Sequence, residues 1–338
     1  MSIYSDSTLE APTSEETRVS GRSLAKSLYD QNLIILLTGE LGAGKTTFAQ
    51  GFAEGLGLTD RVQSPTYALE NQYERLTHID LYRLSSEQAK QFLDHSSDVH
   101  GIKLIEWAER IDRTVIGPHI HVHIDDRRDK RIIHCDFLDH PVPDEHEIDA
   151  WIRDVRLPAH IERHIRQVTA VSDRLVAQLQ KRFPTLLRRQ ALHAAARSHD
   201  LLRFVDFKTY HPDGDFNPSD DDVRRWTELK IRYGTPHEEA AKTFLTEHGY
   251  SVIGDIVSTH SGIDLTGTKT PITTEQKLLT YADKRVLFDQ IVSLDERYAD
   301  FIKRYGKGEE NEQHRKWLSM MKNIEREFFP DGSPDVTS

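Results

Sequence analysis

The sequence predicts an α/β domain followed by an all-α domain, and three observations support this fold class. Apolar runs of strand length alternate with helical patterns up to about Asp139. Beyond that point, apolar residues recur at helical spacing. A chain of 338 residues is also long enough for two domains of ordinary size. We expect the α/β domain over residues 1–140, a linker over 141–155 and the all-α domain over 156–330.

The α/β domain is predicted from short apolar runs and their flanking signals. Thr13 and Glu16 have capping-box spacing ahead of a helix that runs to Leu28. The run "LIILLT", at residues 33–38, is typical of a buried parallel strand, and "TTFAQGFAEGLG" follows it as a helix that ends on Gly57. Further strands are predicted for "TYALENQY", "LTHIDLY", "IKLIEW", "HIHVHID" and "RIIHCDF". The last two surround the charged turn "DRRDK" and indicate a hairpin.

The all-α domain follows a Pro-containing acidic segment, "LDHPVPDEHE", which is typical of a linker. The first long helix carries Val168, Val171, Leu175 and Leu179 on one face. Further helices are predicted for "TLLRRQALHAAARSHDLLRF", "HEEAAKTFLTEHG" and "TTEQKLLTYADKRVLFDQIVSLDERYADFIKRY". We expect the tail after Phe329 to be disordered.

Composition narrows the class of protein. A single cysteine, Cys135, excludes a disulfide within the chain and fits a reducing cytosol. No apolar run approaches the roughly 20 residues that span a bilayer, and the polar N-terminus does not resemble a signal peptide, so we expect a cytoplasmic protein without a membrane segment. The net charge of −11 argues against a broad basic surface, so RNA would be contacted only indirectly, through a partner.

A complete phosphate-binding loop lies between the first apolar strand and the next helix. Gly39, Gly44, Lys45 and Thr46 match the Walker A spacing Gly-x-x-x-x-Gly-Lys-Thr. Glycines let backbone N–H groups turn inward around phosphates, the lysine reaches the β/γ oxygens, and the threonine hydroxyl binds Mg²⁺. By itself, this loop predicts only that a nucleotide binds.

The surrounding motifs are more specific. "LTGELGAGKTTFAQGFAEGLG", "VQSPTYALENQY", "HIDLYRL" and "IKLIEWAERI" follow one another, and this ordered set over roughly residues 15–137 resembles the TsaE family. The resemblance implies a small ATPase that serves the complex installing threonylcarbamoyl on the adenosine next to the tRNA anticodon. It also implies ATP and Mg²⁺ as cofactors, slow regulatory hydrolysis, and partners of the TsaD/TsaB type.

The resemblance also assigns site residues. Phosphate and Mg²⁺ contacts would come from the loop and the start of its helix: Gly39, Gly42, Ala43, Gly44, Lys45, Thr46 and Thr47. Ser64, Pro65 and Thr66 would form a switch-like loop near the γ-phosphate. Asp80 and Glu106 would act around the metal and the attacking water, and Trp107 would line the site. Asp80 could instead simply end a strand, and Trp107 could serve packing alone.

The second domain carries an ordered set of histidines and aspartates. These are His164, His199, Asp200, His237, His260 and Asp283. Their order and flanking words ("HIRQVTAVSDRLV", "HDLLR", "HEEAAKTFLTEHG" and "LLTYADKRV") resemble HD-domain metal-dependent phosphohydrolases, closest to the YqeK-like and HDIG-type branches. His160, one turn before His164, is an alternative ligand.

This second resemblance implies one or two divalent ions of the Mn, Fe or Mg class. His164, His199, Asp200 and Asp283 would hold one ion, and His237 and His260 a second, with Asp200 bridging. Two ions would generate a metal hydroxide for attack on a nucleotide or other phosphoester. Arg203, four residues after His199 and expected on the same helix face, could bind substrate phosphate, and Lys284 is a weaker candidate. Leu202 and Arg203 replace the glycine and lysine of HD-[IL]-G-K, which leaves the substrate open.

The sequence therefore supports a fusion of two enzymes. In one alternative, the HD domain is catalytically idle and serves as a docking or regulatory module. In another, the whole chain is one nucleotide kinase or phosphatase with the second domain as its lid, but the predicted linker and the two complete motif sets argue against it.

Overall fold

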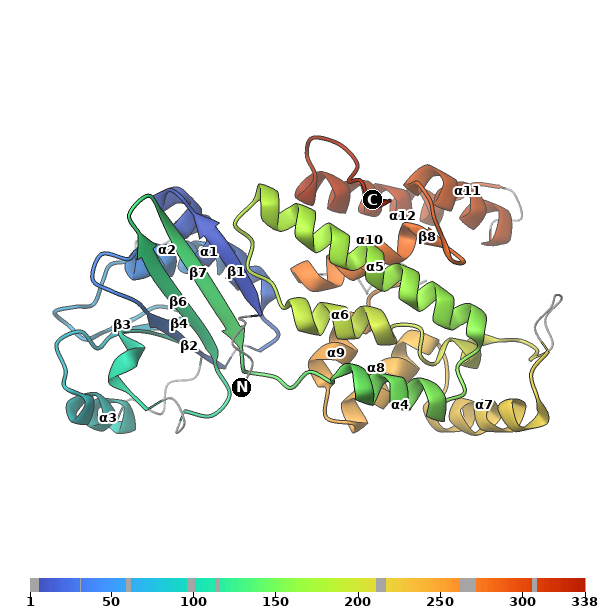
Figure 1. The fold of residues 1–338 in the computed structure, drawn as a ribbon, viewed down its shortest axis with the longest axis horizontal. Helices are drawn as coiled ribbons and strands as arrows, with labels where there is room; N and C mark the ends of the chain where they lie inside the picture. The colour runs from blue at the N-terminus through green and yellow to red at the C-terminus, as the bar shows by residue number, and fades with distance from the viewer. Residues whose placement is uncertain are drawn as a thin grey trace. The chain divides into compact units, whose positions relative to one another are not determined.

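The computed structural model describes residues 6–30, 32–58, 62–95, 101–112, 116–210, 217–261, 272–305 and 309–337 (Figure 1). Its internal contacts divide the chain into two compact units. Unit 1 comprises Met1–Pro141 with Gln180–Arg189, and unit 2 comprises Val142–Leu179 with Gln190–Ser338. Unit 1 is an α/β structure and unit 2 is largely helical, as the sequence predicts. Across the described ranges, no helix is long and apolar enough to cross a bilayer.

Unit 1 is built on a seven-stranded sheet in the order β1-β7-β6-β2-β5-β4-β3. The strands are β1 (Ser7–Ala11), β2 (Leu33–Thr38), β3 (Glu70–Gln72), β4 (Leu76–Asp80), β5 (Ile102–Glu106), β6 (Ile120–Arg127) and β7 (Lys130–Phe137). The central strands β6, β2, β5 and β4 run parallel, and β1, β7 and β3 join antiparallel at the edges. The predicted hairpin of β6 and β7 is present.

Two helical layers cover this sheet. Helices α1 (Ser14–Leu24) and α2 (Lys45–Gly55) pack on one face, against Leu33, Ile35 and Leu37 of β2. Helix α3 (Ser86–His95) packs on the other, where Leu36 of β2 is buried. Because successive side chains of a strand point to opposite faces, a strand covered on both sides needs a continuous apolar run. The sequence "LIILLT" meets that requirement.

Helices α1 and α2 touch backbone to backbone. A Cβ atom at Gly51 would lie 1.9 Å from the carbonyl oxygen of Arg18, and one at Gly21 would lie 2.1 Å from that of Phe48. Only glycine allows this approach. The contact fixes α2, whose first residue is Lys45 of the phosphate loop.

Unit 1 also contains the segment 180–189, which is remote in sequence. Leu186 is fully buried in the core formed by the sheet, α1 and α2, and its backbone N–H donates to Ser23 Oγ at 2.8 Å. Arg188 donates to both carboxylate oxygens of Asp139, at 2.6 and 2.5 Å, and to the carbonyl of Ser27 at 3.0 Å. Both partners of this ion pair are almost fully buried. Ten residues from beyond the first 141 thus complete the core of unit 1.

Unit 2 consists of helices and one short hairpin in its described parts. The helices are α4 (Glu145–Asp154), α5 (Ala159–Arg182), α6 (Arg189–Ser198), α7 (Asp220–Tyr233), α8 (His237–Glu247), α9 (Ser251–Val257), α10 (Thr274–Lys284), α11 (Leu294–Tyr305) and α12 (Glu312–Phe328). The hairpin pairs β8 (Val286–Leu287) with β9 (Gln290–Ile291). One of the three boundaries between the units, after Leu179, falls within α5.

The stretch 273–305, expected to be helical, is interrupted by the hairpin of β8 and β9. Two other segments, expected to be irregular, are ordered. Residues 141–155, expected to be a linker, contain α4, which starts with a capping box of Asp144 and Glu147 and buries Ile148, Trp151 and Ile152. The tail was expected to be disordered, but Val336 is fully buried and its carbonyl accepts a hydrogen bond from Arg174. In both segments, apolar side chains gain enough burial to order a polar stretch.

Candidate functional site

The phosphate loop connects β2 to α2 through three glycines in the left-handed region. Gly39, Gly42 and Gly44 have φ values of 138°, 84° and 105°. A Cβ atom at Gly39 would also lie 2.3 Å from the carbonyl oxygen of Ile124 on β6. These positions therefore require glycine, and the resulting turn presents backbone N–H groups at the N-terminus of α2, where an anion is favoured.

Lys45 is held above this loop. Its Nζ donates to the carbonyls of Gly39 and Glu40 at 2.7 and 2.9 Å, and lies 3.7 Å from the ring centroid of Trp107. Burial lowers the pKa of Lys45, and the charge of Glu106 is the largest of those that oppose this shift. The predicted lysine and tryptophan therefore meet, with the cation on the face of the ring.

The predicted carboxylates come together because β4 and β5 run parallel and pair Asp80 with Glu106 at their carboxyl ends. Thr46 Oγ1 donates to Glu106 Oε2 at 3.1 Å, so the two expected Mg²⁺ ligands are adjacent. Asp80 accepts hydrogen bonds from Ser64 Oγ at 3.1 Å and Thr66 Oγ1 at 2.5 Å. The predicted switch-like loop is thus tied to Asp80, one of the two carboxylates expected to act around the metal and the attacking water.

Other residues of this site were not predicted. His78 is fully buried and its Nε2 lies 2.9 Å from Glu106 Oε1. Tyr82 packs on Trp107 with ring centroids 4.7 Å apart, and Arg131 donates to the carbonyl of Ala43 at 2.9 Å. A signal for His78 existed, since it lies two residues before Asp80 and residues i and i+2 of a strand share a face. Thr47 lies in the first turn of α2, beside Thr46.

Known proteins of one family resemble the N-terminal part of this chain. The family model "Threonylcarbamoyl adenosine biosynthesis protein TsaE" matches residues 11–133. The "tRNA threonylcarbamoyladenosine biosynthesis protein TsaE" of Bacillus subtilis is 37% identical over 123 residues, which cover 34% of this chain and 77% of that protein. The chain belongs to the TsaE family. The TsaE match ends before α4, so it concerns unit 1.

A second TsaE protein and a solved structure also match part of this TsaE chain. The protein of the same name from Synechocystis is 40% identical over 100 residues, which cover 27% of this chain and 63% of that protein. A crystal structure of Bacillus subtilis YdiB is 29% identical and covers 39% of this chain and 85% of that chain, with a TM-score of 0.31.

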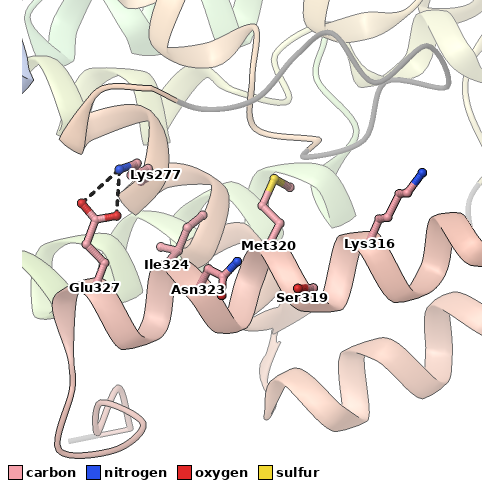
Figure 2. Close-up of a pocket in the computed structure, with 7 residues that line it drawn as sticks. All are labelled: Lys277, Lys316, Ser319, Met320, Asn323, Ile324 and Glu327. Atoms are coloured by element: carbon pink, nitrogen blue, oxygen red, sulfur yellow. Dashed lines mark hydrogen bonds and ion pairs between the residues drawn. The ribbon is translucent and has the colours of Figure 1, made fainter.

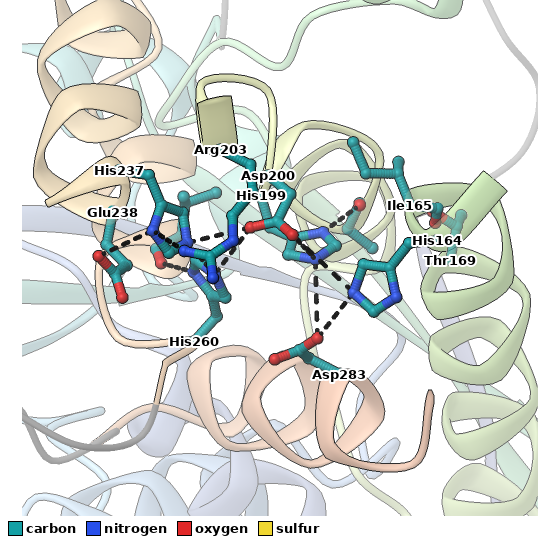
Figure 3. Close-up of polar contacts among 12 residues, drawn as sticks. His164, Ile165, Thr169, His199, Asp200, Arg203, His237, Glu238, His260 and Asp283 are labelled. Atoms are coloured by element: carbon teal, nitrogen blue, oxygen red, sulfur yellow. Dashed lines mark hydrogen bonds and ion pairs between the residues drawn. The ribbon is translucent and has the colours of Figure 1, made fainter. Parts of the chain in front are cut away.

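In unit 2, the six predicted residues converge from five places in the sequence (Figure 3). His164 lies on α5, His199 and Asp200 follow the end of α6, His237 begins α8, His260 follows α9, and Asp283 lies near the end of α10. Each histidine has its Nδ1 beside an oxygen of the protein. The acceptors are the carbonyls of Phe288, Ala196 and Val257 for His164, His199 and His260, and Asp206 for His237. All four Nε2 atoms are left facing the carboxylates.

Asp200 lies between two pairs of histidines. Its Oδ2 lies 3.9 Å from Nε2 of both His164 and His199. Its Oδ1 lies 3.0 Å from His237 Nε2 and 3.4 Å from His260 Nε2. Asp283 Oδ1 joins the first pair, 3.0 Å from His164 Nε2. Each of the two Asp200 oxygens therefore faces a different pair of imidazole Nε2 atoms.

Burial and hydrogen bonding set the charges of this cluster. Burial lowers the pKa of His199 to about 4, so its imidazole is neutral at pH 7. Burial also disfavours the charged form of His237, but hydrogen bonds with Asp200 and Asp206 raise its pKa to about 9. Burial raises the pKa of Asp200, but the surrounding histidines outweigh it and hold that pKa well below the usual range. The cluster thus offers ionised carboxylates and at least one neutral imidazole.

The donor set fits divalent first-row metal ions. His199 Nε2 is buried and has no hydrogen-bond partner, although it points toward Asp200 and Asp283 (Figure 3). A buried lone pair without a donor is costly unless a cation takes that place. His164, His199 and Asp200 could hold one ion and Asp200, His237 and His260 another, since the ligand atoms of each group lie within 4.8 Å of one another.

The structure departs from the prediction at Arg203. Helix α6 ends at Ser198, so Arg203 is not one helical turn from His199 but starts a short 3-10 helix, η4 (Arg203–Asp206). Its Nη1 donates to Asp206 Oδ2 at 2.9 Å. Lys284 donates to Asp283 Oδ2 at 2.5 Å. Both cations thus contact carboxylates of the cluster or beside it.

The alternative ligand His160 has a different environment. Its ring stacks on Phe207 at 6.4 Å, whereas His164 contacts Asp283. Phe288, which accepts from His164, has a φ of 58°, and Glu238 is buried beside His237. Neither residue, nor Asp206, was predicted. Asp206 was the most accessible to sequence reasoning, because it follows Arg203 at a spacing that often forms ion pairs.

A surface pocket of unit 2 lies between α10 and α12 (Figure 2). Its two lysines are paired with carboxylates, Lys277 with Glu327 at 2.8 Å and Lys316 with Glu312 at 2.8 Å. The pocket therefore presents no uncompensated charge for an anionic ligand, and the histidine cluster is the stronger candidate site in unit 2.

Proposed function

We propose that unit 1 hydrolyses MgATP and that this hydrolysis serves the threonylcarbamoyl modification of tRNA adenosine next to the anticodon. The observation that carries the proposal is the contact of Thr46 with Glu106 at the mouth of a complete phosphate loop, in a chain of the TsaE family. Mg²⁺ would neutralise charge that develops on the phosphates. Thr46 and Glu106 would hold it, and the loop glycines would present their N–H groups to the phosphate oxygens.

The remaining residues of unit 1 would divide the work of hydrolysis. Lys45 supplies a cation to the β/γ-phosphates. Asp80, held by Ser64 and Thr66, orients the attacking water, so that movement of this loop changes the rate. Because both loop hydroxyls bond Asp80, the position of the loop and that of this carboxylate would change together. We propose proteins of the TsaD/TsaB type as partners, with tRNA contacted only indirectly.

The test of this proposal is a comparison of wild type with Lys45→Ala. Wild-type protein should bind ATP and hydrolyse it slowly, and TsaD/TsaB-type partners should stimulate it. Lys45→Ala should abolish hydrolysis while the metal content of unit 2 stays unchanged. Wild-type protein that binds no ATP would refute the proposal.

We further propose that unit 2 is an HD-type phosphohydrolase that acts on a nucleotide or another phosphoester. The observation that supports this is the placement of four imidazole Nε2 atoms around the two oxygens of Asp200. Two divalent ions would supply a hydroxide nucleophile and clamp the phosphoryl oxygens. Asp200 would bridge them, and His164, His199 and Asp283 would hold one ion while His237 and His260 hold the other.

This second proposal is tested by metal analysis and a substrate panel. Protein purified without oxygen should contain divalent metal, and turnover on one phosphoester class should disappear in Asp200→Ala. Bound metal without turnover on any substrate would instead support a docking or regulatory module. That alternative draws on the burial of the cluster, which a structural metal site would share.

A further inference from the structure

His237 differs from the other three histidines of the cluster in what holds its Nδ1. The carbonyls of Phe288, Ala196 and Val257 accept from His164, His199 and His260. The Nδ1–H of His237 instead donates to a carboxylate oxygen, Asp206 Oδ2, at 2.6 Å. A carboxylate acceptor makes the imidazole a stronger donor to a metal than an amide carbonyl does.

Asp206 accepts two hydrogen bonds from His237. Its Oδ1 accepts the backbone N–H of His237 at 3.1 Å, while Oδ2 accepts from the ring. This double contact fixes both the start of α8 and the rotation of the imidazole. The Nε2 atom is thereby aimed at Asp200 Oδ1, 3.0 Å away, and at Nε2 of His260, 3.1 Å away.

Arg203 completes this arrangement. Its Nη1 donates to Asp206 Oδ2 at 2.9 Å and also lies 2.8 Å from His237 Nδ1. The ionised Asp206 carboxylate can only accept, so Nδ1 of His237 carries the proton that points to it. The Arg203 guanidinium can only donate, so it bonds Asp206 and not the protonated Nδ1. Glu238 Oε2, buried and without a hydrogen bond, lies 3.3 Å from His237 Nδ1 and adds a second negative charge. Arg203 is the cation that offsets the charge of Asp206.

We propose that Asp206 and Arg203 are positioning residues for the metal ion held by Asp200, His237 and His260. This inference rests on the proposed metal site of unit 2 and gives Arg203 a role different from phosphate binding. The two ions would then be held differently. Among the described residues, no carboxylate accepts a hydrogen bond from Nδ1 of His164 or His199, whose acceptors are backbone carbonyls. Substitution of Asp206 or Arg203 should therefore lower the affinity for the ion at His237 and His260 and leave the affinity for the other ion unchanged.

The experiment is equilibrium dialysis of the full chain against Mn²⁺, with bound metal counted and Mn²⁺ followed by electron paramagnetic resonance. Wild type should bind two ions. In Asp206→Ala, the dissociation constant of one ion should rise about 10- to 100-fold, and that of the other should stay within about threefold. Arg203→Met should lower the affinity for the same ion, and Arg203→Lys should lower it less. The melting temperature in EDTA reports whether each variant folds, and Asp206→Asn, which keeps the side-chain shape, replaces Asp206→Ala if it does not.

The chain offers a matched control in Asp221 and Arg224, an exposed pair also three residues apart. Asp221→Ala and Arg224→Met should leave both Mn²⁺ affinities unchanged. Wild-type affinity for both ions in Asp206→Ala and Arg203→Met would overturn the inference alone, and a raised KM in Arg203→Met would then identify a substrate contact. Wild-type protein that binds no divalent ion would refute the proposed metal site, and this inference with it.

Discussion

The ion pair between Arg188 and Asp139 gives a quantitative test of whether the segment 180–189 belongs to the core of unit 1. Both side chains are nearly excluded from water, at 2% and 3% exposure, and Arg188 makes two short hydrogen bonds to the carboxylate. Arg188→Met would leave Asp139 buried without its cation. Breaking such a pair from one side costs about 3–5 kcal/mol. For a unit of this size, that loss corresponds to a fall in melting temperature of about 10 °C.

The double variant makes the test sharper. Replacing both partners, in Arg188→Met with Asp139→Leu, removes the unpaired charge. The double variant should therefore be more stable than Arg188→Met alone, within about 1–2 kcal/mol of wild type because the bond to the Ser27 carbonyl is still lost. Arg189→Met is the matched control, since this neighbouring arginine is exposed and should change stability by at most about 0.5 kcal/mol.

Differential scanning calorimetry with and without MgATP is the assay. The transition that MgATP raises is that of unit 1, because a ligand stabilises the unit that binds it. Arg188→Met should lower that transition. The reasoning is refuted if Arg188→Met leaves the MgATP-sensitive transition unchanged, or if adding Asp139→Leu makes the protein less stable still.

Three further predictions concern other contacts. Gly51→Ala should destabilise unit 1 by about 2–3 kcal/mol, because its Cβ would lie 1.9 Å from the Arg18 carbonyl; an unchanged MgATP-sensitive transition would contradict this. His78→Ala should raise the Mg²⁺ concentration for half-maximal ATP hydrolysis about 10-fold, because His78 Nε2 contacts Glu106, a proposed Mg²⁺ ligand. If the variant only lowers the melting temperature and leaves the Mg²⁺ dependence unaltered, His78 serves packing alone. Hydrogen bonds to Asp173, and then to Glu145, raise the pKa of His193, so its stabilisation is complete below its unfolded pKa and is lost as pH rises through the folded value. His193→Gln should accordingly narrow the stability difference between pH 6 and pH 8 in thermal melts, and an unaltered pH profile would count against the ion pairs.

Local patterns predicted much of unit 1 because its elements are determined by their own sequence. The strand "LIILLT", the glycine loop and the hairpin around "DRRDK" each contain the residues that shape them. Strand β1 and helix α3 were missed. The five residues of β1 become a strand only by pairing with β7, and that partner lies more than 100 residues away. Such pairing leaves little trace in a short window.

The linker prediction failed for a different reason. Proline and acidic residues dominate "LDHPVPDEHE", but Asp144 and Glu147 also form a capping box, and Ile148, Trp151 and Ile152 follow on one face. The sequence therefore contained a helix signal, but the proline and acidic residues of this segment favoured the linker interpretation.

In unit 2, the order of the histidines predicted which residues meet but not how each ring is held. His199 and Asp200 were placed on a helix, whereas α6 ends one residue earlier, so the expected one-turn relation to Arg203 does not exist. The choice of Nδ1 acceptor depends on carbonyls and carboxylates brought by other elements. Neighbouring residues in the sequence do not determine that choice, although the spacing of Asp206 from Arg203 is a local signal of an ion pair.

The chain passes between the two units three times, after residues 141, 179 and 189. Two units joined by a single tether can be separated by one cut, and each can be inherited, swapped or expressed without the other. Here, cleavage after Pro141 would separate residues 1–141 from the rest of the chain. The ten residues 180–189, which belong to unit 1, would remain on the other fragment. The two units are therefore interleaved along the covalent chain, and a gene segment that ends at residue 141 would encode an incomplete unit 1.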